Sequence, residues 1–418
     1  MLMRQIGSVP SKYVSPPHRI RTIVFGSGER MPMLVRVDTG MPEFDACVYA
    51  TTVVRPGSGS AATIEQALRG VQFLLAFTEL RSIALQERFI DGRFLDAHEL
   101  DELVAMSRRT LRGEQGRQGA LSAKPMRDSV SATTASIRLH YARTYLGWLG
   151  EVTSSRITST LQQRIRYMEL LQGFLDRLSA RIPSGRVMLA RMSLGRDAKA
   201  ELLRVIDPQS IDNPWSSEFH RDRNRLLILW GIGTGLRRGE LLGLRIKALN
   251  FRSNMADIVR RQDDASDPRR LQPNTKTRER SIGISDELAY MTHEHIVRHR
   301  SKLRAARKHD FLFVADDGAP LSLSSVTKIF RGLRLHHPQL GDDLSCHVLR
   351  HSWNEDFSEI ADRAKLSTED ERRARNHAMG WSETSRSADV YLTRRTRRLA
   401  ADASMKIQRH VIGEGEKE

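Results

Sequence analysis

A chain of 418 residues is long enough for two or three domains, and its 39% of hydrophobic residues are enough for more than one core. It has no run near the ~20 apolar residues of a membrane helix, no apolar segment of a secretory signal, and no Cys or His cluster with metal-ligand spacing. Its 67 Lys and Arg residues outnumber its 50 Asp and Glu residues, and the net charge of +17 predicts a polyanionic partner, most often nucleic acid.

Residues 1–60 form an N-terminal segment whose role the sequence does not indicate. Short β-branched runs separated by Gly and Pro predict strands there, at RIRTIVF, MLVRV and CVYATTVV. Over residues 61–182 the apolar residues recur at helical spacing, which predicts a compact helical domain. The first two of its four helices are indicated by the capping boxes Thr63-x-x-Gln66 and Asp96-x-x-Glu99. The other two are indicated by apolar residues at helical spacing, from Ile137 to Trp148 and from Leu161 to near Pro183. A Gly-rich charged stretch at 111–125 predicts a loop.

The second half of the chain has a mixed pattern. We expect a linker at 183–204, a second domain at 205–400 and a C-terminal tail at 401–418. ADIVRRQ and RERSIGIS are predicted strands on either side of a loop, residues 284–308 a long basic helix, and FLFV a short buried strand. Strands and helices do not alternate as in a doubly wound sheet. The expected fold is therefore mainly α with a small β-sheet, in the α+β class.

The stretch GIGTGLRRGELLGL, at residues 231–244, has the look of a nucleotide-binding loop. Its glycines are misspaced for the dinucleotide fingerprint, no βαβ unit surrounds it, and no Walker sequence occurs in the chain. We therefore interpret Gly233, Gly235 and Gly239 as shaping a tight turn that presents Arg237. Glu240 is expected to hold this turn or Arg237 itself, and no nucleotide cofactor is expected.

Three further stretches carry residues with reactive or charged groups. NTKTRERSIGI places Lys276 on a turn between the two predicted strands, and CHVLRHSW places His347 and Arg350 one helical turn apart. HAMGWSETSRSADVYLTRR places Trp381 ten residues before Tyr391, the only tyrosine after Tyr290. His351 is interpreted as a core histidine. The residue types fit the transfer of a phosphoryl ester to a phenol.

In this order the motifs resemble those of the tyrosine recombinases, also called phage integrases. The resemblance spans roughly residues 205–400, and the helical region is similar to the core-binding domain of that family. It implies a catalytic domain that needs neither cofactor nor metal. The family pattern of a G-L-R-x-x-E-L turn, a hairpin lysine, H-x-x-R, a His or Trp and the tyrosine falls on Arg237, Glu240, Lys276, His347, Arg350, Trp381 and Tyr391.

The chemistry of these residues supports the same interpretation. Guanidinium groups at Arg237 and Arg350 can clamp the phosphate oxygens by forked, charge-assisted hydrogen bonds. Tyr391 would attack phosphorus to form a covalent phosphotyrosine, and a base such as His347 would accept the phenolic proton. By resemblance, Lys276 protonates the departing sugar oxygen. Trp381 offers an indole N–H to the phosphate.

Two assignments and two other functions remain open at this point. Arg278 and Arg280 compete with Lys276 as the hairpin cation, and His377 competes with Trp381. The polar stretch KLSTEDERRARN, between Arg350 and Trp381, is longer than the family usually has. A type IB topoisomerase uses a similar residue set to relax DNA. A DNA-binding regulator on the same scaffold is the non-catalytic alternative.

The resemblance implies site-specific recombination, in the integration or excision of a bacterial mobile element. The expected partners are double-stranded DNA, three further copies of the chain in a synaptic homotetramer, and accessory DNA-bending or element-encoded proteins. The tail after Tyr391 is expected to form a helix that packs on a neighbouring protomer. We expect a cytoplasmic, nucleoid-associated protein without membrane contact.

Overall fold

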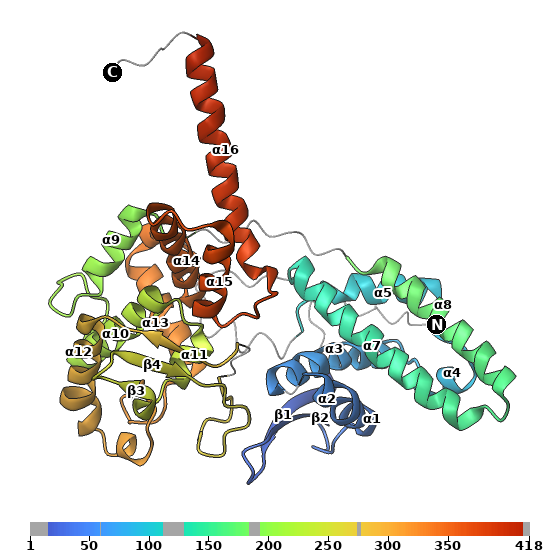
Figure 1. Cartoon of the computed structure of the whole chain (residues 1–418). Coiled ribbons are helices and arrows are strands. Elements are labelled where there is room, and N and C mark those ends of the chain that lie inside the picture. Colours follow the sequence, from blue (N-terminus) through green and yellow to red (C-terminus); the bar gives the residue numbers. More distant parts are fainter. Residues whose placement is uncertain (1–15, 59, 112–128, 184–192, 274–276, 413–418) are drawn as a thin grey trace, which may run out of the picture. The chain divides into compact units, whose positions relative to one another are not determined.

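The computed structural model describes residues 16–58, 60–111, 129–183, 193–273 and 277–412. The chain divides into two compact units, residues 1–188 and 189–418, each mainly helical with a small antiparallel sheet. The expectation of an α+β fold without a doubly wound sheet is confirmed (Figure 1). Among the described helices none is long and apolar enough to cross a membrane.

In the first unit a β-hairpin precedes a group of helices. Strands β1 (His18–Val24) and β2 (Arg30–Arg36) pair antiparallel, with His18 opposite Arg36. Buried apolar side chains of β2 share one core with the helices. The helices are α1 (Phe44–Tyr49), α2 (Arg55–Ser58), α3 (Ala61–Leu80), α4 (Leu85–Ile90), α5 (Ala97–Ser107), α7 (Ala132–Ile157) and α8 (Leu161–Arg181).

The prediction of a strand at CVYATTVV was wrong. These residues lie in α1 and in the π-helical turn Ala50–Val54 that follows it. Here Ala46, Tyr49, Ala50 and Val54 are buried at helical spacing, and the ring of Tyr49 contacts two aromatic rings of α7. Packing against the helical core therefore outweighs the strand preference of β-branched residues.

The helix ends follow local capping rules, with one correction. Asp96 caps α5 by the expected capping box with Glu99, and α8 ends at Arg181, just before Pro183. The box expected at Thr63 does not form, because α3 already begins after Ser60. Of the loop predicted at 111–125, all but Leu111 lies outside the described residues.

In the second unit, helices surround a three-stranded sheet in the order β3-β4-β5. Strands β4 and β5 confirm the two predicted around the hairpin, and Ile258 pairs with Arg280. Residues 196–205, at the end of the expected linker, are helical. The elements are α9 (Arg196–Val205), α10 (Glu218–Thr234), α11 (Arg238–Gly243), β3 (Leu249–Asn250), β4 (Met255–Ile258), β5 (Arg280–Gly283), α12 (Asp286–Glu294), α13 (Leu323–His336), α14 (Cys346–Arg363), α15 (Thr368–Met379) and α16 (Asp389–Ile412).

In this unit one prediction is confirmed only in part, and another was wrong. Of the long basic helix predicted at residues 284–308, only α12 is α-helical, and the chain continues after Glu294 as π-helical and 3₁₀ turns. There the buried Arg300 donates to the carbonyl oxygens of Ala306, His309 and Phe311. FLFV is buried but forms only single β-bridges at its two ends, so it is not a strand. The side-chain bonds of Arg300 fold this segment back on itself.

Helix α16 begins with the segment that carries Tyr391 and then projects beyond the other elements of its unit (Figure 1). Residues 400–411 are exposed along their whole length, including Ile407 and Val411. The helical form expected for the tail is confirmed. Its packing on a neighbouring protomer stays a prediction.

Candidate active site

The turn at residues 231–244 depends on one glycine. Gly235 ends α10 with a φ of +64°, in the left-handed region that favours glycine. A Cβ atom there would lie 2.8 Å from Cε of Met379 and 3.0 Å from the Trp353 ring. Gly233 lies inside α10 and Gly239 inside α11, so the prediction that these two also shape the turn was wrong.

Arg237 precedes α11 and points its guanidinium toward the end of α15. Its backbone N–H donates to Oε2 of Glu240 at 2.7 Å, and its Nη1 lies 3.4 Å from the carbonyl oxygen of Met379. The side chain is half-buried, and burial lowers the pKa of Arg237. The expected link between Glu240 and this turn is therefore present.

Glu240 is buried and connects α11 to the hairpin. Besides the Arg237 backbone, it accepts hydrogen bonds from the Thr277 hydroxyl and from Nη1 of Arg280 at 2.9 Å. Burial raises the pKa of Glu240, but these hydrogen bonds and the Arg280 charge outweigh it and leave the pKa below its ordinary value. Arg280 also donates to the Ala378 carbonyl at 2.7 Å. The hairpin, α11 and α15 are thus joined at one carboxylate.

Arg350 lies on α14 with its guanidinium buried. Its Nη1 donates to the Gly235 carbonyl at 2.7 Å and lies 3.9 Å from Oε2 of Glu240, and its Nη2 lies 3.3 Å from the Met379 carbonyl. Burial and then the charge of Arg237 lower the pKa of Arg350. The guanidiniums of Arg280 and Arg350 thus lie beside one carboxylate, and that of Arg237 reaches the same Met379 carbonyl as Arg350. An anion beside them would offset this excess of positive charge.

Tyr391 comes from the first turn of α16 and is only 7% exposed. Its hydroxyl oxygen lies 2.8 Å from Nδ1 of His351. The Trp381 ring contacts both the Tyr391 ring and the Arg350 guanidinium, and the guanidiniums of Arg237 and Arg350 both reach the Met379 carbonyl, so the phenol and the two guanidiniums belong to one site. The fully buried Arg375 guanidinium lies 5.1 Å from the centre of the Tyr391 ring.

The two histidines of α14, His347 and His351, lie next to each other. Nε2 of His351 lies 3.0 Å from Nε2 of His347, so His351 lies between His347 and the Tyr391 hydroxyl. His347 is exposed and His351 is half-buried. The interpretation of His351 as a core histidine was therefore wrong, because its ring faces the phenol.

Trp381 contacts the site, whereas His377 does not in the described contacts. The Trp381 ring stacks on Tyr391 with a centroid distance of 6.5 Å, and the Arg350 guanidinium lies 5.4 Å from its centre. His377 is exposed in the last turn of α15. Of the two alternatives, the geometry favours Trp381.

Comparison with known proteins finds a family match over part of the chain. Residues 209–361, which hold Arg237, Glu240, His347 and Arg350, match the model of the phage integrase family. Over these residues the chain is similar to the phage integrase family. It is also 26% identical over 201 residues to the tyrosine recombinase XerD of Haemophilus ducreyi. That match covers 48% of this chain and 61% of the relative.

Two solved structures are similar to the chain at low sequence identity. The Tn1549 transposon integrase in complex with transposon right end DNA is 14% identical, with a TM-score of 0.48, over 85% of this chain and 99% of that one. The XerH site-specific recombinase bound to difH substrate is 17% identical, with a TM-score of 0.41, over 86% of this chain and 93% of that one.

The hairpin lysine of the phage integrase pattern, Lys276, lies outside the described residues. One of its competitors is already engaged, because Arg280 donates to both Glu240 and Ala378. Arg278 is exposed, and its backbone N–H donates to the Gly380 carbonyl at 3.0 Å. The other six expected site residues all lie in one cluster.

Two residues beside the site, Glu371 and Arg375, were not identified from the sequence. The polar stretch KLSTEDERRARN contributes to α15, where Glu371 and Arg375 are fully buried and paired at 2.5 Å. Arg375 also donates to the Asn354 carbonyl of α14 at 2.6 Å. Their spacing of four residues was the available signal. In the described part of the chain, no group of three His, Cys, Asp or Glu side chains could hold a metal ion.

Proposed function

We propose that this protein is a site-specific DNA recombinase that integrates or excises a bacterial mobile element through a covalent 3′-phosphotyrosyl intermediate. One observation carries the proposal. A buried phenol, Tyr391, contacts an imidazole and shares its site with the guanidiniums of Arg237 and Arg350. A phenol placed in this way serves as a nucleophile toward an anionic ester.

The cleavage step transfers a phosphoryl ester without a change in its charge. The phenolic oxygen of Tyr391 bonds to phosphorus as the bond from phosphorus to the 5′ oxygen breaks. Negative charge builds up on the non-bridging oxygens, and Arg237 and Arg350 supply forked donors for them. The indole N–H of Trp381, which has no hydrogen-bond partner among the described residues, is a third donor. In rejoining, the 5′ hydroxyl of another strand attacks phosphorus and releases Tyr391, so the strand is exchanged and not hydrolysed.

The phenolic proton leaves through His351. Nδ1 of this ring accepts from the Tyr391 hydroxyl, which places the ring hydrogen on Nε2, next to Nε2 of His347. His347, which is exposed, then passes the proton onward. In this scheme His351 is the base in contact with the nucleophile, and His347 is the second member of the relay.

The departing 5′ oxygen receives its proton from Lys276. The sequence places this lysine one residue before Thr277, which donates to Glu240 at the centre of the arginine cluster. A positioned ammonium group can protonate an alkoxide as the bond to phosphorus breaks. Family resemblance supports this role.

Duplex DNA is the proposed substrate, with four copies of the chain in the synaptic complex and accessory proteins that bend the DNA. The net charge of +17 supports a polyanionic partner. Type IB topoisomerase activity is the second enzymatic candidate, because cleavage and rejoining would be the same. Exchange between two duplexes separates these functions, since a topoisomerase relaxes one duplex.

The test is a covalent adduct assay on a nicked suicide duplex that carries the element's end. Wild-type protein and Tyr290→Phe, a control at an exposed tyrosine of the same unit, should both give a shifted band on a denaturing gel. Tyr391→Phe should give none while it binds the duplex with unchanged affinity. An adduct with Tyr391→Phe, or no adduct with wild-type protein on a duplex shown to bind, would contradict the proposal.

A further inference from the structure

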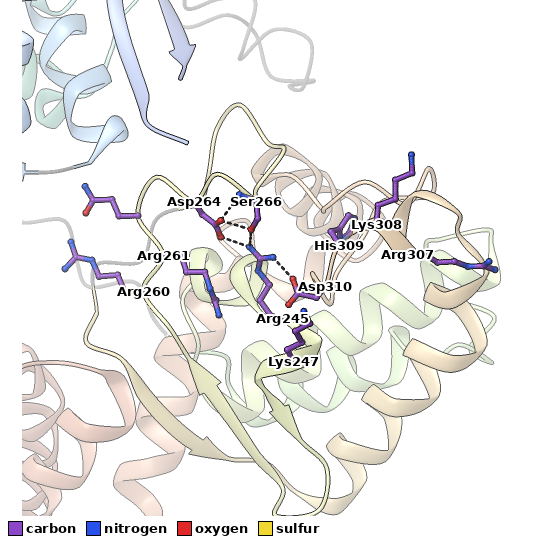
Figure 2. Close-up of a pocket in the computed structure, with 11 residues that line it drawn as sticks. Arg245, Lys247, Arg260, Arg261, Asp264, Ser266, Arg307, Lys308, His309 and Asp310 are labelled. Carbon is purple, nitrogen blue, oxygen red and sulfur yellow. Dashed lines mark hydrogen bonds and ion pairs between the residues drawn. The ribbon is translucent and has the colours of Figure 1, made fainter. Parts of the chain in front are cut away.

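A second basic site lies outside the candidate active site. Eleven residues from three parts of the second unit line a pocket of about 810 Å³ (Figure 2). None of the active-site residues is among them. We call it the Arg245 pocket, and its lining residues are Arg245, Lys247, Arg260, Arg261, Gln262, Asp264, Ser266, Arg307, Lys308, His309 and Asp310.

Arg245, at the centre of the pocket, is buried and fixed by its neighbours. It donates to Asp264 at 2.6 Å, to Ser266 at 3.1 Å and to Asp310, and its guanidinium lies 3.7 Å from the centre of the Phe311 ring. Figure 2 shows Asp264 and Asp310 on two sides of this guanidinium. Both carboxylates of the lining are therefore engaged by one arginine.

Four of the five other cations of the lining are exposed, and Arg261 is half-buried. Lys247, Arg260, Arg307 and Lys308 are exposed and form no ion pair within the described residues. Six lysine and arginine side chains against two carboxylates leave the pocket with four excess positive charges. Such a concentration of charge in a hollow attracts anions, and guanidinium and ammonium groups suit phosphate oxygens.

The pocket adjoins the hairpin that carries the active-site residues. Strand β4 leads into its loop, and the backbone N–H of Arg260 donates to Oε1 of Glu279 at 3.1 Å, one residue before Arg280. One hairpin thus connects the loop of the Arg245 pocket to the carboxylate of Glu240. The volume of the pocket exceeds that of a single phosphate group.

We propose that the Arg245 pocket binds backbone phosphates of the DNA duplex other than the phosphate that is cleaved. This inference rests on the proposed function in one respect, namely that the bound anion belongs to DNA. Arg245 provides the fixed floor of the site, and Lys247, Arg260, Arg307 and Lys308 neutralise the phosphates. The contact is independent of base sequence and raises affinity for any duplex.

The experiment measures how duplex affinity depends on salt. A lysine that neutralises a phosphate adds about 0.9 to the slope of log affinity against log salt concentration. The double variant Lys247→Gln with Lys308→Gln removes two such charges without touching the ion pairs of Arg245. Its slope should fall by about 1.8, so that the affinity ratio between 50 and 200 mM salt shrinks by about tenfold.

Lys328→Gln with Lys365→Gln is the matched control. Both lysines are exposed in the same unit and lie outside the pocket, and the variant loses the same net charge. Its slope should equal that of wild-type protein. A duplex of arbitrary sequence suffices, because binding without sequence preference is measured. Circular dichroism should show that both double variants are folded.

Two results would overturn this inference. One is a slope that falls equally in both double variants, which would show an effect of net charge alone. The other is an unchanged slope for the pocket variant. If calorimetry then shows that this variant no longer binds tripolyphosphate, the pocket serves a free anion and not DNA. The adduct assay on wild-type protein tests the proposed function separately, because it requires Tyr391 and none of these lysines.

Discussion

The hydroxyl oxygen of Tyr391 lies 2.8 Å from Nδ1 of His351, the residue that follows the second arginine of the family pattern. Nε2 of the same ring lies 3.0 Å from His347. A single imidazole with both nitrogens engaged connects the proposed nucleophile to the histidine that the family pattern would select as base. Proton transfer through one ring shifts the hydrogen between its two nitrogens.

His351→Asn tests this relay. The asparagine oxygen can replace Nδ1 as acceptor for the Tyr391 hydroxyl, but nothing replaces Nε2, so the path to His347 is cut. We expect the single-turnover cleavage rate to fall about 10²-fold with duplex affinity unchanged. His377→Asn, at an exposed histidine of α15, should cleave at the wild-type rate. If His351→Asn keeps the wild-type rate, His351 only positions the phenol.

Glu240→Gln should destabilise the second unit. The amide keeps the size and some hydrogen bonds of the carboxylate but leaves the buried Arg280 and Arg350 guanidiniums without their counter-charge. Breaking a buried pair in this way costs about 3 kcal/mol in the free energy of unfolding. Urea unfolding followed by tryptophan fluorescence measures the change. Glu369→Gln, which removes a surface partner of Arg373, should cost under about 1 kcal/mol.

The same variant should show a defined pH dependence. The pKa of Glu240 is lower in the folded protein than its ordinary value, so the carboxylate contributes stability that is fully present above its unfolded pKa of ~4.3. That contribution is lost as the pH falls toward the folded pKa. The stability difference between wild type and Glu240→Gln should therefore be constant near neutral pH and shrink below about pH 4. A difference that grows with acid would contradict the pKa shift.

Gly235→Ala and Gly233→Ala separate the turn from its sequence neighbours. Alanine at Gly235 must adopt a φ of +64° and approaches Met379 and Trp353, so we expect a loss of more than about 1 kcal/mol in thermal unfolding. The change should also reduce cleavage, because the Gly235 carbonyl anchors Arg350. Gly233 is helical with open space around it, so its alanine variant should be neutral or slightly stabilising. Equal losses in both variants would contradict this interpretation.

Those parts of the site that rest on short-range spacing could be predicted from the sequence. Glu240 follows Arg237 by three residues at the start of a helix. At this spacing a glutamate carboxylate accepts a hydrogen bond from the backbone N–H of the residue that caps the helix, here Arg237. Asp96 and Glu99 predicted the start of α5 on the same ground. In such cases the local chain determines the contact, whatever the rest of the fold does.

Contacts between distant segments could not be predicted in this way. The environment of His351 depends on where α16 returns, forty residues later in the chain. Arg375 lies in a run of charged residues typical of a solvated helix face, yet it is fully buried, where its guanidinium donates to the Asn354 carbonyl of α14, twenty-one residues earlier. The strand preference of CVYATTVV is likewise overridden, since Tyr49 packs on the aromatic rings of α7. In each case the deciding partner is remote in sequence.

Lys276 is the assignment that a modified substrate can test most directly. A general acid is needed only when the leaving group is a poor one, and a sulfur atom in place of the bridging 5′ oxygen leaves as a thiolate without a proton. We expect Lys276→Ala to cleave the ordinary duplex at least about 10²-fold more slowly than wild type. It should cleave the sulfur-substituted duplex at nearly the wild-type rate. Arg278→Ala, at the exposed neighbour, should change neither rate by more than a few fold, and rescue of Arg278→Ala by sulfur would transfer the proton-donor role to that arginine.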